Sequence, residues 1–299
     1  MLRAVGSCSV IDIFQLLCIQ GKRAHYGERF GLPANCFPVS IPAFPQSPRA
    51  ERFHRFFQAY QPFTKTHALR FKMLNFSYAN PTRLVFGRSA EHEVGRVMTS
   101  ILGRPGKVLV LFGGGSAHRT GILGAVEDSL QESGFAVIEM GGVQPNPRMG
   151  FVRDTIDWVR DQGIRAVVAV GGGSVIDTAK AVAAGLEYEG DAWDFFAGRA
   201  QVERALPVFA VLTIPAAGSE QSIRAVITHH GTKTGIGSEH IRPKAAFINP
   251  ERFSTLPAIH ISAGVCDMLS HICERYFSNT AATDFVDGQA EAALRTIID

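Results

Sequence analysis

Two glycine-rich turns are the part of this 299-residue sequence that points most directly to chemistry. Both have the sequence Gly-Gly-Gly-Ser, and they occupy residues 113–116 and 171–174. Glycine lets a backbone approach a phosphate closely, and a helix that starts next directs free N–H groups and its positive dipole end at the anion. A single such turn could equally be a plain strand-to-helix connection with a serine N-cap. Two of them favour a nucleotide site, although neither is a GxGxxG motif or a P-loop.

Asp177 and Lys180 follow the second turn within the first turns of the expected helix. Asp177 could stabilise the helix dipole, or it could accept a hydrogen bond from a cofactor. Lys180 could be an ordinary solvated side chain. The sequence alone leaves these alternatives open.

Asp267 and His271 are four residues apart in a helical stretch, so their side chains lie about 40° apart around the helix and can reach one metal ion. An ordinary i,i+4 hydrogen-bonded pair explains them equally simply, and the residues alone favour it. Cys266 and Cys273 point about 130° away from that direction, which indicates core cysteines rather than ligands. Four other histidines show no ligand spacing and are interpreted as surface or loop residues: His229, His230, His240 and His260.

The elements that would hold these residues alternate between strand and helix. Valine-rich runs flanked by glycine at 107–112, 135–139 and 165–170 predict strands buried on both faces. Apolar residues at three- and four-residue steps in 120–133 and 150–162 predict amphipathic helices. This alternation predicts an α/β fold with a doubly wound, right-handed parallel sheet.

The rest of the chain continues this pattern and then changes. A helix is expected at 175–186, followed by strands at 207–214, 225–229 and 245–249. From residue 257 onward the sequence is helical in character, with helices expected at 265–277 and 281–298. A helical domain is therefore expected to begin near the C-terminal end of the chain.

Composition excludes several classes of protein. With 46% hydrophobic residues, the chain can bury a full core. The net charge of +3 comes from residues 1–72, which hold ten Lys/Arg against three Asp/Glu; the remainder holds twenty against twenty-four, so we expect no nucleic-acid partner. The apolar stretch at 10–19 is too short and polar to span a membrane. Five cysteines without framework spacing favour a cytoplasmic protein.

Residues 1–72 differ from the rest of the chain. They hold nine of the 21 phenylalanines and show no period of 2 or 3.6 residues, so we expect a disordered extension. Two interpretations compete: an arginine-rich targeting peptide, or upstream sequence translated because the true start is Met73. The second is favoured, because a transit peptide should be amphipathic and serine-rich.

Residues 73–299 strongly resemble the N-terminal part of the iron-containing (group III) alcohol dehydrogenases, most closely the branch of NADPH-dependent aldehyde reductases and butanol dehydrogenases. The resemblance rests on six blocks in the family's order, at 80–87 (Asn-Pro-Thr-Arg-Leu-Val-Phe-Gly), 113–116, 145–147, 170–180, 213–220 and 264–271.

The resemblance implies a dinucleotide-binding α/β domain, here 73–255, followed by an all-helical domain of the dehydroquinate synthase type that begins at 256–299 and is truncated. The active site is expected between the two domains. One divalent metal ion, Fe²⁺ or Zn²⁺, is implied, held by an aspartate and three histidines. Asp267 and His271 match the first two ligands. The other two are expected beyond residue 299, so the chain is expected to be an N-terminal fragment.

The implied reaction is hydride transfer between a primary alcohol or aldehyde and a nicotinamide ring, with the metal as Lewis acid. NADP(H) is expected rather than NAD(H), because glycine and serine stand where NAD-dependent relatives carry an acid, and His118 and Arg119 are nearby. A small-molecule substrate and a possible homodimer are also implied. By the same resemblance, the following residues line the cofactor site: Gly113, Gly114, Ser116, Asn146, Gly172, Gly173, Ser174, Asp177, Thr213 and Lys233.

Three positions depart from the family pattern. Ala217 replaces a threonine, Ser222 an asparagine and Arg224 a small residue, and each change removes or crowds a nucleotide contact. Two alternatives are therefore kept. One is an enzyme like glycerol dehydrogenase, which shares the implied fold, and the other is a catalytically inactive nucleotide-binding protein.

Overall fold

The computed structural model describes residues 77, 79–278, 280 and 283–298. The expected extension at 1–72 therefore lies outside the described residues. The described chain falls into two units, Ser77–Gly264 and the segment from Val265 onward, and the boundary lies within one helix.

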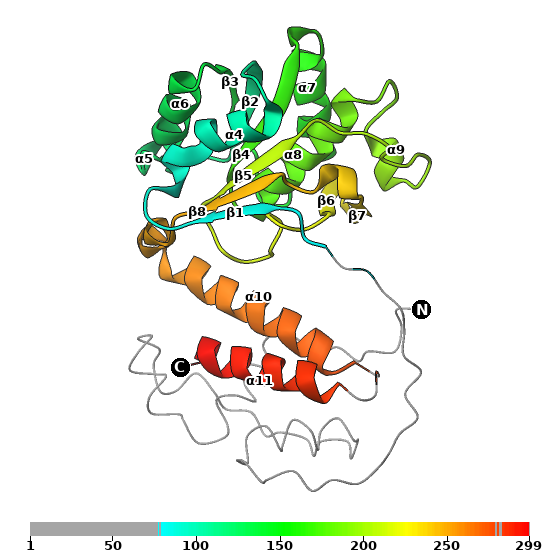
Figure 1. The fold of residues 1–299 in the computed structure, drawn as a ribbon. Coiled ribbons are helices and arrows are strands. Elements are labelled where there is room, and N and C mark those ends of the chain that lie inside the picture. The colour runs from blue at the N-terminus through cyan, green and yellow to red at the C-terminus, as the bar shows by residue number, and fades with distance from the viewer. Residues whose placement is uncertain (1–76, 78, 279, 281–282, 299) are drawn as a thin grey trace, which may run out of the picture. The chain divides into compact units, whose positions relative to one another are not determined.

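A six-stranded parallel sheet forms the centre of the first unit (Figure 1). Its strand order is β1-β8-β5-β4-β2-β3. This confirms the α/β fold class with a parallel sheet. The strands are β1 (Arg83–Phe86), β2 (Lys107–Phe112), β3 (Ala136–Met140), β4 (Ile164–Gly171), β5 (Val208–Leu212) and β8 (Ala245–Ile248).

Helices cover both faces of this sheet, as Figure 1 shows. On one face lie α4 (Val94–Leu102) and α6 (Ile122–Glu132); on the other lie α7 (Met149–Val159) and α8 (Gly173–Leu186). The short elements are α5 (Ser116–Arg119), α9 (Trp193–Phe196), η1 (Ala90–Glu93), η2 (Arg160–Gln162), η3 (Glu239–Ile241) and η4 (Pro250–Thr255).

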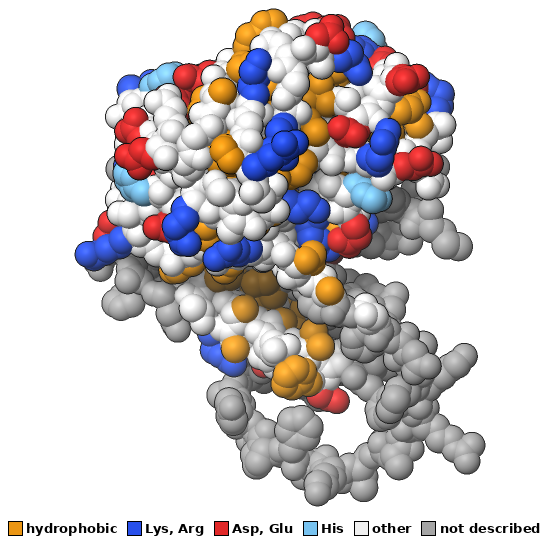
Figure 2. Space-filling view, turned by 45° about the horizontal axis from the view of Figure 1, so that its top comes forward, with side chains coloured by type: hydrophobic (Ala, Val, Ile, Leu, Met, Phe, Trp, Pro, Cys, Tyr) orange, Lys and Arg blue, Asp and Glu red, His pale blue; other side chains and the backbone are white. Residues whose placement is uncertain are grey.

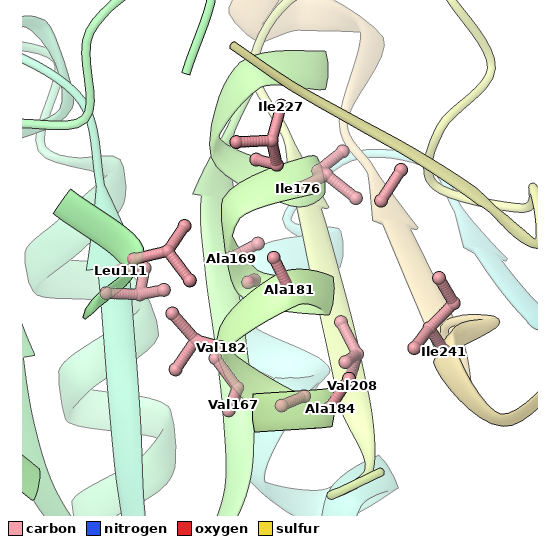
Figure 3. Packing of buried hydrophobic residues seen from close by; sticks show 14 of the residues in the cluster. Leu111, Val167, Ala169, Ile176, Ala181, Val182, Ala184, Val208, Ile227 and Ile241 are labelled. Atoms are coloured by element: carbon pink, nitrogen blue, oxygen red, sulfur yellow. The ribbon is translucent and has the colours of Figure 1, made fainter. Parts of the chain in front are cut away.

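The four central strands of the sheet are buried on both faces because they are apolar at consecutive positions. The prediction of a fully buried strand at 135–139 is wrong, because β3 lies at the edge of the sheet and is partly exposed. Along β2, Val108 and Val110 join the core beneath α4 and α6, whereas Leu109 and Leu111 join the core beneath α7 and α8. Figure 3 shows the second core, where small side chains of α8 face the strands. Alanines on α8, such as Ala181, let the helix lie close to β4.

A separate antiparallel hairpin consists of β6 (Arg224–His229) and β7 (Thr232–Gly237). The sequence predicted a strand at 225–229 but none at β7. The β7 sequence, Thr-Lys-Thr-Gly-Ile-Gly, has no apolar alternation, so its strand conformation depends on pairing with β6.

Two helices, α10 (Ala258–Tyr276) and α11 (Asp284–Ile298), end the described chain. The sequence predicted both, but α10 begins at Ala258 rather than at 265. Cys273 is buried with Leu269 of α10 and Leu294 of α11, as expected for a core cysteine, whereas Cys266 is only half-buried. Among the described residues, no helix combines the length and hydrophobicity that a membrane crossing requires.

Charged side chains of both signs are interspersed on the surface that Figure 2 presents.

Candidate functional site

The two glycine turns are neighbours at one edge of the sheet. Strands β2 and β4 pair in parallel, and their last paired residues are Phe112 and Val170. The first residues of the two turns, Gly113 and Gly171, directly follow these paired positions. Paired strands lie about 4.8 Å apart. The turns therefore leave the carboxyl edge side by side, where open α/β sheets bind ligands.

The second turn opens directly into α8, a helix of 14 residues. Its N-cap is Gly172, and no side chain caps the helix, so Ser174 does not act as the serine cap of the simple-turn interpretation. At Gly171 a Cβ would lie 2.4 Å from a methyl group of Val175, so a larger residue would displace the helix start. The first turn of α8 thus offers its backbone N–H groups and dipole to an anion.

The first turn differs from this expectation. It leads into α5, a helix of only four residues, and Gly121 with φ of 72° separates α5 from α6. The helix predicted at 120–133 is α6, so it does not start at the turn. Ser116 is the first residue of α5, and its N-cap is Gly115. A Cβ at Gly114 would have no atom within 4 Å, which leaves open space above the turn.

Thr213 lies at the same edge as the second turn, because its backbone N–H donates to the carbonyl oxygen of Gly171 at 3.1 Å. Asn146 and Lys233 are also brought together, with Lys233 Nζ 3.4 Å from Asn146 Oδ1. The N–H of Thr228 in β6 donates to the carbonyl oxygen of Pro147, which fixes the hairpin to the loop after β3. Asn146 itself adopts a left-handed φ of 55°.

Asp177 is held by the protein itself. Its Oδ1 accepts from the hydroxyl of Ser219 at 2.6 Å, and its Oδ2 accepts from the backbone N–H of Val226 at 3.0 Å. Burial raises the pKa of Asp177, although these hydrogen bonds and the nearby Lys180 act in the opposite direction. The carboxylate therefore links α8 to β6 and to the loop between β5 and β6.

Lys180 is fully buried, so its interpretation as a solvated side chain is wrong. Its Nζ lies 2.7 to 2.9 Å from four oxygens of the β5–β6 loop and β6. Burial lowers its pKa to about 8, although Asp177 and Glu220 act against that shift. The sequence carried a signal for this burial, because Lys180 lies on the same side of an apolar helix as Ile176 and Ala183. The residue type alone, a lysine, indicated exposure instead.

The departures from the family pattern lie around the same loop. The exposed Ala217 has its Cβ 3.7 Å from the position a Cβ at Gly173 would take. Ser222 Oγ accepts from the backbone N–H of Arg224, whose side chain is exposed.

Asp267 and His271 lie on α10 in the second unit, with Asp267 Oδ1 3.8 Å from His271 Nε2. About half of each side chain is exposed. Two donor atoms each about 2.1 Å from one ion can be at most about 4.2 Å apart, so the pair can ligate a single ion. Within the described residues no group of three or more candidate ligands converges, so the pair forms a partial site.

Three of the remaining histidines, His230, His240 and His260, are exposed as expected. His229, the last residue of β6, is partly exposed and packs against Trp193, with ring centroids 4.5 Å apart.

Comparison with known proteins gives a consistent result. Residues 81–250 match the family model described as iron-containing alcohol dehydrogenase. The chain is 42% identical over 229 residues to the probable NADH-dependent butanol dehydrogenase 1 of Bacillus subtilis, covering 76% of this chain and 58% of the relative. It is 36% identical over 232 residues to the NADPH-dependent aldehyde reductase YqhD of Escherichia coli, again covering 76% of this chain and 58% of the relative.

Among solved structures, the NADH-dependent butanol dehydrogenase A of Thermotoga maritima superposes with a TM-score of 0.72 at 42% identity, covering 75% of this chain and 56% of that one. The chain thus spans somewhat more than half the length of these relatives. The family match covers both glycine turns and the strands that carry them. The chain therefore belongs to the iron-containing alcohol dehydrogenase family.

Proposed function

We propose that the protein containing this chain transfers a hydride between a primary alcohol or aldehyde and a nicotinamide dinucleotide. One observation carries the proposal: the two triglycine turns leave the paired ends of β2 and β4, next to Thr213. The similarity to butanol dehydrogenases and an aldehyde reductase supports the substrate class.

The chain's own groups have distinct roles in this proposal. Backbone N–H groups at Gly172, Gly173 and Ser174 bind the pyrophosphate, because the helix start has no side-chain cap. Gly114 and Ser116 line the open side of the first turn. Gly113 follows the end of β2 and is held against the segment after β3, since its carbonyl oxygen accepts a hydrogen bond from the N–H of Gly142.

Asn146, Asp177, Thr213 and Lys233 complete the proposed cofactor surface. Lys233 is exposed on β7 and carries the positive charge that favours an anionic ligand near Asn146. Asp177 acts mainly by fixing α8 against β6, because both carboxylate oxygens already accept protein hydrogen bonds.

Asp267 and His271 are proposed as two ligands of a divalent metal ion, Fe²⁺ or Zn²⁺. Carboxylate oxygen and imidazole nitrogen are donors that both ions accept, and the 3.8 Å separation fits. When bound, such an ion supplies Lewis acidity to the oxygen of the substrate.

NADP(H) is proposed as the preferred cofactor. Arg119 carries this proposal, because its guanidinium nitrogen lies 3.0 Å from the position a Cβ at Gly115 would take, so the cation extends over the first turn. The turn itself has no acidic residue to hold the 2′-hydroxyl of NAD(H). The relatives' names include both cofactors, so Arg119 is the residue to test.

Replacing Arg119 with alanine should lower kcat/KM for NADPH by about 10- to 100-fold and change kcat/KM for NADH little, because a charge-assisted hydrogen bond to phosphate contributes about 1.5–3 kcal/mol. Arg104, an exposed arginine before β2, provides the control Arg104→Ala. An equal loss with both cofactors, or none, would exclude Arg119 as the determinant.

The activity itself is tested with the purified protein, each nucleotide and butanal or butan-1-ol, before and after metal chelation. We expect NADPH binding and metal-dependent reduction of butanal. Binding without turnover would favour the catalytically inactive alternative, and absence of binding by either nucleotide would refute the proposal.

We also propose a cytoplasmic location and a homodimer. The spacing of the five cysteines, which fits no disulfide framework, supports a reducing compartment. The homodimer rests on family resemblance and is tested by light scattering.

A further inference from the structure

A buried network of charged and polar groups connects α8 to the loop between β5 and β6. The hydroxyl of Ser219 donates to Asp177 Oδ1 at 2.6 Å and accepts from Lys180 Nζ at 2.9 Å. Lys180 is fully buried and Ser219 is almost so. Transferring an ammonium from water to a protein interior is unfavourable, and surrounding hydrogen bonds must offset that desolvation.

The ammonium of Lys180 gathers carbonyl oxygens from a single short segment. Its Nζ contacts the carbonyl oxygens of Ser219, Ser222 and Arg224 at 2.7, 2.8 and 2.7 Å. Carbonyls accept but cannot donate, so only a donor with several protons satisfies all three at once. An apolar side chain of similar size would leave them buried without this donor.

The same segment borders the second glycine turn. It starts at Thr213, which hydrogen bonds to Gly171, and passes Ala217 beside Gly173. It then continues into β6, whose hairpin carries Lys233. Residues 218–222 have only turn-type backbone hydrogen bonds of their own in the described structure, from Gln221 to Gly218 and from Ser222 to Ser219. Its conformation therefore depends on tertiary contacts such as those of Lys180.

We propose that Lys180 is a positioning residue for the nicotinamide dinucleotide. Its ammonium, together with Ser219 and Asp177, holds residues 213–224 against the second glycine turn, so that turn and segment form one preorganised surface. This inference rests on the proposed function and adds a residue that does not itself touch the ligand.

The electrostatic surroundings favour the charged form that this role needs. Asp177 of α8 and Glu220 of the loop stabilise the ammonium, whereas Arg242, which follows η3, opposes it. With a pKa of about 8, Lys180 is largely protonated at neutral pH and provides three N–H donors to the loop.

Hydrogen exchange of the nucleotide-free protein tests the positioning directly. Ser219→Ala removes one hydroxyl without removing the lysine, and Lys180→Met removes the ammonium. We expect faster exchange in residues 219–226 of both variants and unchanged exchange in β2. The control is Thr155→Val on α7, whose buried hydroxyl donates, in the described part of the chain, to the carbonyl oxygen of Phe151 in its own helix. Unchanged exchange in residues 219–226 of Ser219→Ala would overturn the proposal.

Binding of NADPH, followed by its fluorescence, supplies the second measurement. Ser219→Ala should weaken binding by about two- to tenfold, the equivalent of one hydrogen bond, and Ser219→Thr should restore it. Thr155→Val should bind as the wild type does. If Lys180→Met does not fold, the serine variants still decide the question.

The two hypotheses fail in different ways. Wild-type protein that binds neither NADPH nor NADH would refute the proposed function and, with it, the ligand of this inference. Normal wild-type binding with unchanged affinity in Ser219→Ala would refute the positioning role alone.

Discussion

Ionisable side chains inside the first unit are stabilised to very different extents. Glu91 is almost fully buried, and it accepts hydrogen bonds from Asn249 and Arg252. Lys180 is equally buried and is surrounded by carbonyl oxygens. Glu127 on α6 has neither arrangement, because its Oε1 is buried and has no hydrogen-bond partner. Burial, and next the charge of Glu139, raise the pKa of Glu127 to about 7.

Glu127→Gln should stabilise the protein at pH 8 by about 1–2 kcal/mol, less than the full shift implies because the side chain is partly exposed. Because the pKa of Glu127 is higher in the folded state, its ionisation lowers the stability of the protein as pH rises from about 4.5 to 7. The stabilisation by Glu127→Gln should therefore vanish near pH 4.5. Urea unfolding at both pH values measures it. Glu132→Gln, on the same helix but exposed, should show no such pH dependence; equal effects at both pH values would contradict the assignment.

Asp267 and His271 should each be required for tight metal binding. Calorimetric titration of the protein with Zn²⁺ should show at least about tenfold weaker binding for Asp267→Ala and for His271→Ala, since loss of one ligand leaves the ion loosely held. His260→Ala is the matched control, because His260 is an exposed histidine of the same helix. Equal loss in all three variants would indicate adventitious surface binding.

The ends of two neighbouring strands position the two glycine turns. Strands β2 and β4 are in register up to Phe112 and Val170, so the following glycines leave the sheet together. Their roles differ, however. Gly171 is needed for packing, because a Cβ there would overlap Val175, whereas a Cβ at Gly114 would meet no atom.

This difference predicts that Gly114→Ala separates binding from folding. The φ of Gly114 lies outside the left-handed region and the space is open, so the melting temperature should change by no more than about 2 °C. NADPH affinity should fall by about tenfold or more, because the added methyl group occupies the approach of the phosphates.

The control for this change is Gly124→Ala on α6, where a Cβ also meets no atom. It should leave affinity unchanged and raise stability slightly, since alanine favours helix. Retention of full NADPH affinity in Gly114→Ala would show that the first turn does not contact the cofactor.

Segments far apart in the sequence are joined across the first unit by an ion pair between the buried carboxylate of Glu91 and the partly exposed Arg252. Arg252 of η4 donates to Glu91 of η1 at 2.7 Å and to the carbonyl oxygen of Thr120, which follows α5, at 2.9 Å. Asn249 adds two hydrogen bonds to the same carboxylate. The pair thus ties the start of the first helix layer to the segment that precedes α10.

Arg252→Met should therefore lower the free energy of unfolding by about 3–5 kcal/mol, because it leaves the Glu91 carboxylate buried with an incomplete set of partners. Arg88 provides the comparison, since its ion pair with Glu251 is exposed (84% and 56% of the two side chains). Arg88→Met should cost less than about 1 kcal/mol. Similar losses in both variants, by urea unfolding, would contradict the role of burial.

The local pattern of apolar residues and glycines was sufficient to predict most strands and helices of the first unit. Valine-rich runs bounded by glycine predicted β2 and β4, because strands buried on both faces must be apolar at consecutive positions. The same pattern predicted β3 as a strand, but not its partly exposed position at the edge of the sheet. The i,i+4 spacing of Asp267 and His271 placed both on one side of α10, where the structure has them. The sequence also identified the glycine turns and the family, since these depend on residues adjacent in the chain.

Features that depend on distant residues required the tertiary structure. Strand β7 exists through pairing with β6, and α5 is cut off from α6 by the left-handed Gly121. The oxygens that bind the ammonium of Lys180 come from residues 219–224, some 40 positions away, so its hydrogen-bond partners could not be read from the sequence. The sequence by itself determined the family and predicted which residues could bind a phosphate or a metal ion. Only the tertiary structure, through the strand order of the sheet and the packing of the β5–β6 loop on α8, decided which of these residues lie together. Burial and hydrogen-bond partners arise only when remote segments pack against each other.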